Sequence, residues 1–132
     1  MDIKQKRAGD LMSAEVITIA AQETLRAAAK ALTRHAVHCL VVPSDEPGRC
    51  AGVITVKDLV QVLCDGESYL LDQLRVCDAM TTPSVSVQRD FLLADCLQLM
   101  RMSGVRSAPV LDGTRLVGIL SFTDVLRAAA AD

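Results

Sequence analysis

Apolar residues along the chain follow two different spacings. Short runs rich in β-branched residues are typical of strands, whereas apolar positions that recur every three or four residues are typical of helices with one buried face. Leu25, Ala28 and Leu32 follow the helical spacing, and so do Leu93 and Met100. The pattern predicts strands at 16–19, 39–42, 51–54, 85–87, 108–111 and 116–120, and helices at 25–32, 56–63, 69–76, 93–100 and 122–130.

The second half of the chain repeats the first half. The segment Asp10-Leu11-Met12-Ser13 recurs 68 residues later as Asp78-Ala79-Met80-Thr81, and the same offset joins Val42 to Val110. Beyond a loop at residues 43–50 the offset shortens to 66, which is what a short insertion in a surface loop produces. Because order and spacing agree across both halves, we predict an internal duplication.

Each half predicts one βαββα unit. A single unit of this size cannot bury both faces of its sheet, whereas two units packed sheet to sheet close a common core. We therefore expect an α/β (α+β) fold of two repeats related by pseudo-twofold symmetry. The first repeat is expected at 8–64, a linking segment at 65–75 and the second repeat at 76–130.

Composition argues against nucleic-acid and membrane partners. The chain has 132 residues, of which 51% are apolar, so a sizeable core is expected. Its formal net charge is −2, and it contains one Tyr, two Phe and no Trp, so it lacks both a basic field and stacking platforms for nucleic acid. The charged N-terminal residues 1–10 do not resemble a signal peptide, and no apolar stretch is long enough to span a membrane. We expect a soluble, cytoplasmic protein.

The cysteines and histidines suggest no metal centre or catalytic group. The five cysteines are widely spaced, and no C-x-x-C or Cys/His cluster occurs, so they are interpreted as reduced thiols that fill the core. No G-x-S-x-G, G-x-G-x-x-G or Walker A segment is present either. We therefore expect neither a metal site nor an enzyme.

A glycine, a hydroxyl and a carboxylate recur where a strand is expected to run into a helix. They form Gly52-x-x-Thr55-x-x-Asp58 and Gly118-x-x-Ser121-x-x-Asp124. A hydroxyl followed three residues later by a carboxylate is typical of a helix-capping box. A carboxylate also suits the vicinal hydroxyls of ribose, because it accepts hydrogen bonds from both of them. Spacing alone leaves the two interpretations open, and capping explains neither the glycine nor the duplication.

The two halves together resemble a tandem pair of cystathionine-β-synthase (CBS) domains, or Bateman module, over nearly the whole chain. An ordered set of segments that occurs twice carries the resemblance. The set comprises Asp10-Leu11-Met12 and Asp78-Ala79-Met80, Val37-His38 and Gly104-Val105-Arg106-Ser107-Ala108-Pro109-Val110, and the two Gly-x-x-Thr/Ser-x-x-Asp segments. The resemblance implies clefts between the paired repeats that bind AMP, ADP, ATP or another adenosyl compound such as S-adenosylmethionine.

By the same resemblance, the ligand of the first repeat is expected to contact five positions. Asp58 and Thr55 would bind its ribose, the backbone of Ile17-Thr18 would lie against adenine, and His38 would meet phosphate.

In the second repeat the resemblance assigns the matching roles. Asp124 and Ser121 would bind ribose, Val85-Ser86 would lie against adenine, and Arg106 would meet phosphate.

The two predicted sites differ in charge. His38 stands where the family frequently has Arg, and because imidazole groups titrate near ~6.5, a histidine is a weaker phosphate clamp than Arg106 at neutral pH. Lys57 and Thr123 follow the two hydroxyls by two residues. Lys57 either adds a cation to the first site or is a solvated residue at a helix start.

The resemblance implies a regulatory module that catalyses nothing and reports energy or metabolite state to an effector protein. It also implies a homodimer, and the apolar helix faces exceed what the core of one module needs. Two alternatives stay open. One is a structural dimerisation module with vestigial nucleotide sites, and the other is a regulatory fragment of a larger enzyme or transporter.

Overall fold

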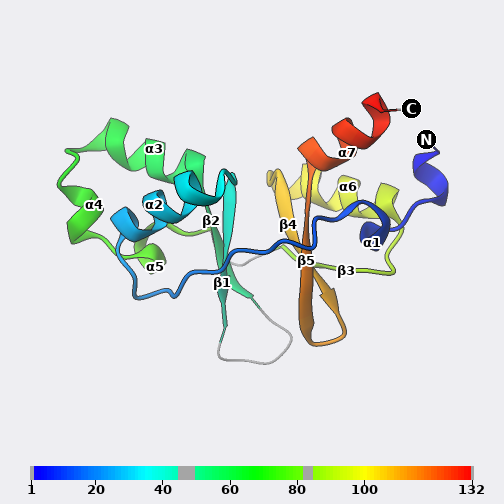
Figure 1. Ribbon diagram of the computed structural model, residues 1–132, viewed down its shortest axis with the longest axis horizontal. Helices are drawn as coiled ribbons and strands as arrows, with labels where there is room; N and C mark the ends of the chain where they lie inside the picture. The colour runs from blue at the N-terminus through cyan, green and yellow to red at the C-terminus, as the bar shows by residue number, and fades with distance from the viewer. Residues whose placement is uncertain (1, 45–49, 82–84, 132) are drawn as a thin grey trace. The chain divides into compact units, whose positions relative to one another are not determined.

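A computed structural model of the chain describes residues 2–44, 50–81 and 85–131 (Figure 1). The chain divides into two compact units: unit 1 comprises Met1–Val16 and Val85–Asp132, and unit 2 comprises Ile17–Ser84. The point at which the repeat offset shortens falls on residues 45–49, which lie outside the described residues.

Unit 2 is a two-stranded hairpin with helices. It contains α2 (Leu25–His35), β1 (Cys39–Pro43), β2 (Cys50–Thr55), α3 (Val56–Asp65), α4 (Leu70–Gln73) and α5 (Val76–Ala79). β1 and β2 are antiparallel, with Cys39 opposite Thr55 and Leu40 opposite Ile54. The hairpin and helices enclose a core of Leu25, Ala28, Leu32, Leu40, Val42, Ile54, Leu59 and Val76.

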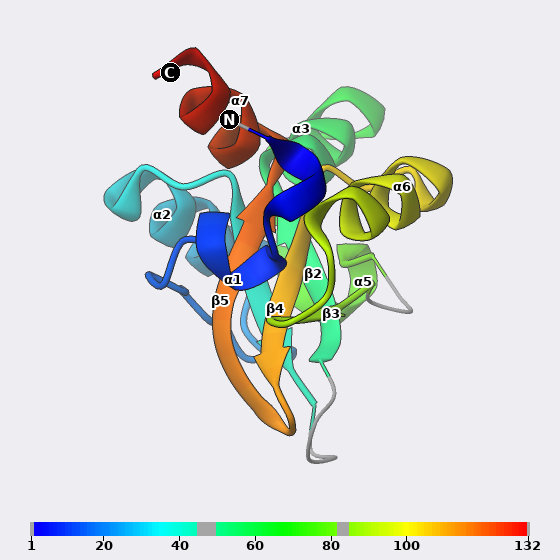
Figure 2. The same ribbon diagram turned by 90° about the vertical axis from the view of Figure 1, so that its right-hand side faces the viewer.

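Unit 1 has a three-stranded mixed sheet. It contains η1 (Ile3–Gln5), α1 (Ala8–Leu11), β3 (Val87–Gln88), α6 (Leu93–Ser103), β4 (Ser107–Asp112), β5 (Arg115–Ser121) and α7 (Phe122–Ala130). β3 is parallel to β4, β4 is antiparallel to β5, and α1 contacts β3, β5 and α7 (Figure 2). The mixed α+β class predicted from the sequence is confirmed. The core of this unit contains Ala8, Val87, Leu93, Cys96, Met100, Ala108, Val110, Leu120 and Val125.

The long helices α2 and α6 occupy matching positions in the two repeats and end in the same backbone conformation. The N–H of Ala27 donates to the Thr24 hydroxyl at 3.1 Å, which caps the start of α2. α2 ends at Ala36 with φ 53°, and α6 ends at Gly104 with φ 72°. This left-handed conformation favours glycine, because a Cβ crowds the backbone there. The first repeat therefore carries a strained helix end that the second repeat avoids.

Each compact unit is completed by the segment that precedes the other repeat. At the start of α6 the N–H of Leu93 donates to the carbonyl of Lys6 at 2.8 Å, and at the start of α2 the N–H of Leu25 donates to the carbonyl of Leu74 at 3.0 Å. Each repeat is contiguous in sequence and begins with a short segment, here called its leader, at residues 2–16 for the first repeat and 70–81 for the second. Each compact unit joins the leader of one repeat to the remaining residues of the other. The exchange continues downstream, with antiparallel bridges from Ser13 to Ile119 and from Thr81 to Val53.

The glycine of each Gly-x-x-Thr/Ser-x-x-Asp segment lies where an exchanged leader crosses the sheet. A Cβ on Gly52 would lie 2.6 Å from the carbonyl oxygen of Thr81, and a Cβ on Gly118 would lie 2.7 Å from that of Ser13. Neither glycine has a left-handed φ, so the requirement is close approach of two backbones. Packing therefore explains the glycine that helix capping leaves unexplained.

The predicted elements at 16–19, 69–76 and 85–87 differ from the structure. The first contributes one parallel bridge, between Thr18 and Val41, instead of a strand, and the third is confined to β3. The predicted linking helix is split into α4 and α5 because Leu74 is extended. The N–H of Leu74 closes α4, and its carbonyl accepts the bond from α2 that completes the unit.

Of the four cysteines whose side chains the structure describes, the interpretation as core thiols is correct for two and wrong for two, and the side chain of Cys50 lies outside the description. Cys39 and Cys96 are buried, whereas Cys64 near the end of α3 and Cys77 in α5 are exposed. An apolar sequence context does not reveal which face of a short helix a residue occupies, which is why the prediction failed there.

Arg26 of α2 and Asp72 of α4 form a bidentate ion pair within unit 2. The guanidinium donates to the two carboxylate oxygens at 2.6 and 2.9 Å. These hydrogen bonds hold the pKa of Asp72 below its usual range and raise the pKa of Arg26. Both side chains are exposed, so the pair orients α4 against α2 more than it stabilises the unit.

Candidate functional site

The hydroxyl and carboxylate of the first repeat meet at the junction of β2 and α3. The N–H of Asp58 donates to Thr55 Oγ1 at 3.2 Å, which caps α3. Asp58 Oδ2 accepts in return from the N–H and the hydroxyl of Thr55, both at 2.9 Å. Within the described parts of the chain, Asp58 Oδ1 has no hydrogen-bond partner. One carboxylate oxygen therefore remains available.

The second repeat has a similar junction, between β5 and α7, with one additional charge and, among the described residues, without the bond from the N–H of the capping residue to the carboxylate. The N–H of Asp124 donates to Ser121 Oγ at 3.1 Å, and the Ser121 hydroxyl donates to Asp124 Oδ2 at 2.8 Å. Arg127 lies 3.3 Å from the other oxygen, Oδ1, one turn along the helix. The Arg127 side chain is 73% exposed, so this contact is a weak one.

Capping uses only part of each carboxylate. The caps predicted from the spacing are confirmed by the four hydrogen bonds of the Thr55 and Ser121 hydroxyls. Each carboxylate oxygen has two lone pairs, so Asp58 and Asp124 can accept further hydrogen bonds without giving up the cap. Helix capping and ribose binding are therefore compatible, and ribose binding stays a prediction.

The residue that opens the second strand of each repeat adjoins the same junction. The first helical N–H, from Val56, donates to the carbonyl of His38 at 3.1 Å, and that of Phe122 donates to the carbonyl of Arg106 at 3.0 Å. The side chains of His38 and Arg106 are exposed. Neither has a hydrogen-bond or ion-pair partner among the residues that the structure covers. The backbone thus places a residue with an exposed polar side chain beside the start of each capped helix.

The segments predicted to lie against adenine run beside the second strand of their own repeat. The N–H of Val41 donates to the carbonyl of Ile17, and the N–H of Ile19 donates to the carbonyl of Val41, both at 3.0 Å. In the second repeat Pro109 stands at the position of Val41. Proline has no N–H, so the matching bond to the carbonyl of Val85 cannot form. The carbonyl of Val85 therefore lacks the strand N–H donor that the carbonyl of Ile17 has in the first repeat.

The remaining predicted site residues are more loosely placed. Thr18 is exposed and Ser86 is partly buried, each within its own segment beside the strand. Lys57 and Thr123 are exposed at the second positions of α3 and α7. Lys57 has no ion-pair partner within the described ranges, so its geometry fits a solvated helix-start residue as well as a ligand contact.

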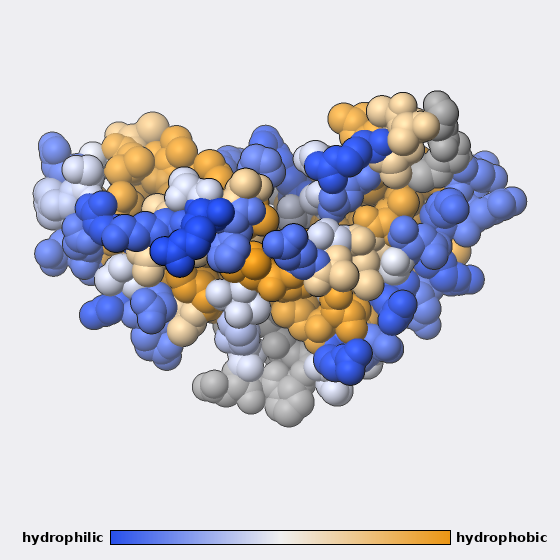
Figure 3. All heavy atoms as spheres, viewed as in Figure 1, coloured by the Kyte–Doolittle hydropathy of each residue, from blue (hydrophilic) through white to orange (hydrophobic). Residues whose placement is uncertain are grey.

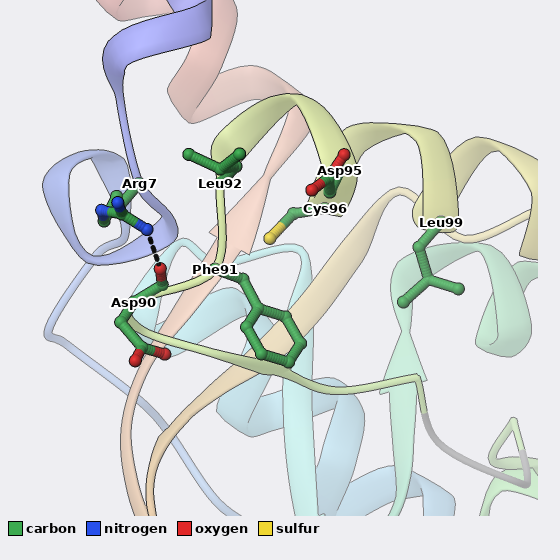
Figure 4. A pocket seen from close by; sticks show the side chains of 7 residues that line it. All are labelled: Arg7, Asp90, Phe91, Leu92, Asp95, Cys96 and Leu99. Carbon is green, nitrogen blue, oxygen red and sulfur yellow. Dashed lines mark hydrogen bonds between the residues drawn. The ribbon is translucent and has the colours of Figure 1, made fainter.

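A separate open pocket of about 420 Å³ lies in unit 1, away from these residues. Arg7, Asp90 and Asp95 line it together with the apolar side chains of Phe91, Leu92, Cys96 and Leu99 (Figure 4). The NH1 group of Arg7 donates to the carbonyl of Asp90. Burial raises the pKa of the Cys96 thiol. At the positions of Phe91, Leu92 and Leu99, the first repeat has Glu23, Thr24 and Ala31. The pocket is therefore not duplicated, unlike the hydroxyl–carboxylate pairs.

The described residues hold neither a candidate metal site nor a candidate membrane-spanning helix. Among the residues described, no three His, Cys, Asp or Glu side chains come together in a way that could hold a metal ion. In the same residues, no helix combines the length and the apolar character that crossing a membrane requires.

Both repeats match one protein family. The CBS domain family matches residues 8–65 and again residues 76–131. The chain belongs to the CBS domain family. Each match contains one of the hydroxyl–carboxylate pairs, so the duplication predicted from the sequence is a pair of CBS repeats, and such pairs are regulatory modules.

Relatives and a solved structure agree with this assignment. An uncharacterized protein of Methanopyrus kandleri is 30% identical over 90% of this chain, which spans 60% of that protein. Arabinose 5-phosphate isomerase KdsD of Yersinia pestis is 31% identical over 92% of this chain, which spans 37% of the isomerase. The crystal structure of a CBS domain pair in complex with 5′-methylthioadenosine and S-adenosyl-L-methionine has a TM-score of 0.81 at 23% identity, covering 96% of this chain and 97% of that one. That likeness shows the shared CBS-pair fold.

The structure groups the predicted residues by CBS repeat. Those of the first repeat all lie in unit 2, and those of the second all lie in unit 1. Sequence reasoning missed Arg127, although its position one turn after Asp124 was a readable signal for an ion pair. The change from Val41 to Pro109 was a second readable signal, because proline has no N–H and so predicts the loss of one hydrogen bond beside this strand.

Proposed function

We propose that this CBS pair is a non-catalytic regulatory module that binds an adenosine-containing ligand at each repeat and transmits the bound state to a partner protein. The observation that supports this most is the duplicated junction, where a carboxylate with unused lone pairs follows a strand whose neighbour opens with an exposed polar residue that has no side-chain partner among the described residues. Two such junctions in one chain suit the sensing of a ligand better than a single reaction centre.

In unit 2 we assign ribose to Asp58 and Thr55. Asp58 Oδ1 would accept from a ribose hydroxyl while Oδ2 maintains the helix cap. His38 would face a polar substituent at the 5′ position, and the backbone of Ile17 and Thr18 would contact the adenine edge.

In unit 1 we assign the same roles to Asp124 with Ser121, to Arg106, and to the backbone of Val85 and Ser86. The carbonyl of Val85 can accept a hydrogen bond from an adenine amino group because Pro109 has no N–H to donate to it.

The residues assigned to the sites suit equilibrium binding. In each set the hydroxyl that is hydrogen-bonded to the carboxylate also accepts the capping N–H of its helix, so both groups hold the helix start in place. AMP, ADP, ATP and S-adenosylmethionine-type compounds are the candidate ligands. These metabolites are abundant in the cytoplasm, where we propose that the module works.

A structural role as a dimerisation module is the second candidate, and one observation favours it. The helices that follow the two junctions expose apolar side chains at matched positions, Val60 on α3 and Leu126 on α7, with 49% and 70% of their surfaces accessible. Figure 3 shows hydrophobic surface over both helices. We propose that these faces join two copies of the chain, which is compatible with ligand binding at the junctions.

A thermal-shift panel separates sensing from a purely structural role. The panel contains AMP, ADP, ATP, S-adenosylmethionine, 5′-methylthioadenosine and adenosine. A ligand that binds only the folded state at a hundredfold excess over Kd adds about 2.7 kcal/mol, several degrees in Tm for a domain of this size. At least one compound should produce such a shift, and Asp58→Ala with Asp124→Ala should abolish it. No shift with any compound at millimolar concentration would leave the structural role as the better account.

A further inference from the structure

The two proposed ligand sites differ at matched positions in the groups that would meet the ligand. Arg106 of the second repeat corresponds to His38 of the first, and both side chains are exposed and unpartnered within the described residues. A guanidinium is a permanent cation whose planar fork of N–H donors binds phosphate in a bidentate fashion, whereas an imidazole ring has no such fork. Only the site of unit 1 therefore has a permanent cation at this position.

The surroundings of the two carboxylates differ in the same direction. Asp124 has Arg127 at 3.3 Å, so a second guanidinium stands at the junction of unit 1. At the matched position of unit 2, Gln61 is neutral, and its side-chain amide donates to Asp65 at 3.0 Å. Asp58 consequently keeps an unshared oxygen for a neutral hydroxyl donor, and its charge is not offset by an arginine.

Lys57 is a cation at the unit 2 junction, and it differs in kind from Arg106. Its ammonium group is compact and strongly hydrated, and it lies exposed at the second position of α3. Such a group gains less from a phosphate than a guanidinium does, because it lacks the planar fork that matches two phosphate oxygens. Its contribution can be measured separately, because Thr123 is the matching residue of the other repeat.

We propose that the two sites take different classes of adenosyl ligand. The site of unit 1 takes phosphorylated adenosine nucleotides, and the site of unit 2 takes unphosphorylated adenosyl compounds such as nucleosides and their thioethers. The chain then reads two ligands independently instead of one ligand twice. This inference rests on the proposed function, because it assigns ligand classes to the same two junctions.

Calorimetric titration with AMP and with adenosine tests the inference one site at a time. Asp58→Ala leaves only the site of unit 1, and Asp124→Ala leaves only the site of unit 2; Asp58→Asn and Asp124→Asn replace them if circular dichroism shows a folding defect. We expect the site of unit 1 to bind AMP about tenfold or more tightly than adenosine. The site of unit 2 is expected to bind adenosine at least as tightly as AMP.

Reciprocal substitutions then identify the cause of the preference. In the Asp58→Ala background, Arg106→His should remove most of the AMP preference. In the Asp124→Ala background, His38→Arg should create one, and Lys57→Thr should change the ratio less than about threefold. Arg101→His, at an exposed position on α6, serves as the control and should leave every ratio unchanged.

The outcomes separate this inference from the function on which it rests. Equal AMP-to-adenosine ratios at both sites, or a ratio unaffected by Arg106→His, would overturn the division of ligand classes while leaving two adenosyl sites in place. Loss of all binding of both compounds by the unmodified chain would overturn the proposed function as well.

Discussion

Single residues at matched positions of the repeats show which features the fold requires. Thr55 and Ser121 both cap a helix with their hydroxyls, and both hydroxyls donate to the carboxylate three residues on, whereas only Asp58 also accepts from the N–H of the capping residue. Where the two repeats differ, the fold tolerates either residue, and the difference can affect ligand binding or stability instead. We propose that the difference between His38 and Arg106 affects the charge of the ligand, and we expect the difference between Ala36 and Gly104 to affect stability.

Ala36→Gly should stabilise the protein. Ala36 ends α2 at φ 53°, a conformation that costs a residue with a Cβ roughly 1–2 kcal/mol, and part of this gain is offset by the flexibility of glycine in the unfolded chain. We expect about 0.5–1 kcal/mol of added stability in urea denaturation. The reciprocal control is Gly104→Ala, which meets no atom within 4 Å of the new Cβ and should destabilise by a similar amount. A lower midpoint for Ala36→Gly would contradict this account of the helix end.

At the scale of elements, close contact between the leaders and the sheets fixes the glycines. Met12 and Met80 lie against Gly118 and Gly52, so each leader presses both backbone and side chain onto the strand that precedes a capped helix. The glycine therefore helps to position the junction, although it precedes the carboxylate by six residues.

Gly118→Ala and Gly52→Ala should each destabilise the protein by about 1–3 kcal/mol, because the added methyl group overpacks a backbone contact. The new Cβ of Gly118→Ala would lie 2.5 Å from the sulfur of Met12 as well as 2.7 Å from the carbonyl oxygen of Ser13. Chemical denaturation measures the loss, with Thr114→Ala in the exposed β4–β5 turn as the control. Wild-type stability of both glycine variants would mean that the leaders are not held where the structure puts them.

Element patterns in the sequence predicted most of the fold because they depend on local periodicity. The apolar spacing of α2, α6 and α7 and the hydroxyl before each capped helix are local signals, and the predicted helices and hairpins follow them. The break at Leu74 was missed because it depends on a hydrogen bond to Leu25, far away in the sequence.

The exchange of leaders could not be predicted for a related reason. Asp10-Leu11-Met12 and Asp78-Ala79-Met80 carry the same pattern, so the sequence does not say which unit each one completes. The candidate site fared differently. Spacing located the two carboxylates, but only the geometry showed that Asp58 keeps an unshared oxygen and that Asp124 has Arg127 as a neighbour.

At the scale of the whole molecule, α3 and α7 expose apolar side chains to solvent. Val60 and Leu126 occupy the same position in the two repeats and are both exposed, although each unit already has its own buried core. Matched exposed apolar positions are typical of an interface between copies of a chain.

Leu126→Glu should therefore shift the protein from dimer to monomer at micromolar concentration, because a charge would be buried in an apolar interface. Sedimentation velocity measures the change. Ser103→Glu, which adds the same charge at an exposed polar position on α6, should remain dimeric. A protein that is monomeric before any substitution would contradict the dimer.

The stoichiometry of adenosine binding tests the central claim most directly, because each repeat is proposed to supply one carboxylate for one ribose. Calorimetric titration carried to saturation of both sites, of which the site of unit 1 is the weaker for adenosine, should find two adenosine molecules per chain, one per chain in Asp58→Ala and in Asp124→Ala, and none when both are replaced. Each replacement weakens one helix cap, which costs about 1 kcal/mol of folding free energy, so all variants should remain folded by circular dichroism. Two adenosine molecules bound by the doubly substituted chain would show that these carboxylates cap helices and take no part in ligand recognition.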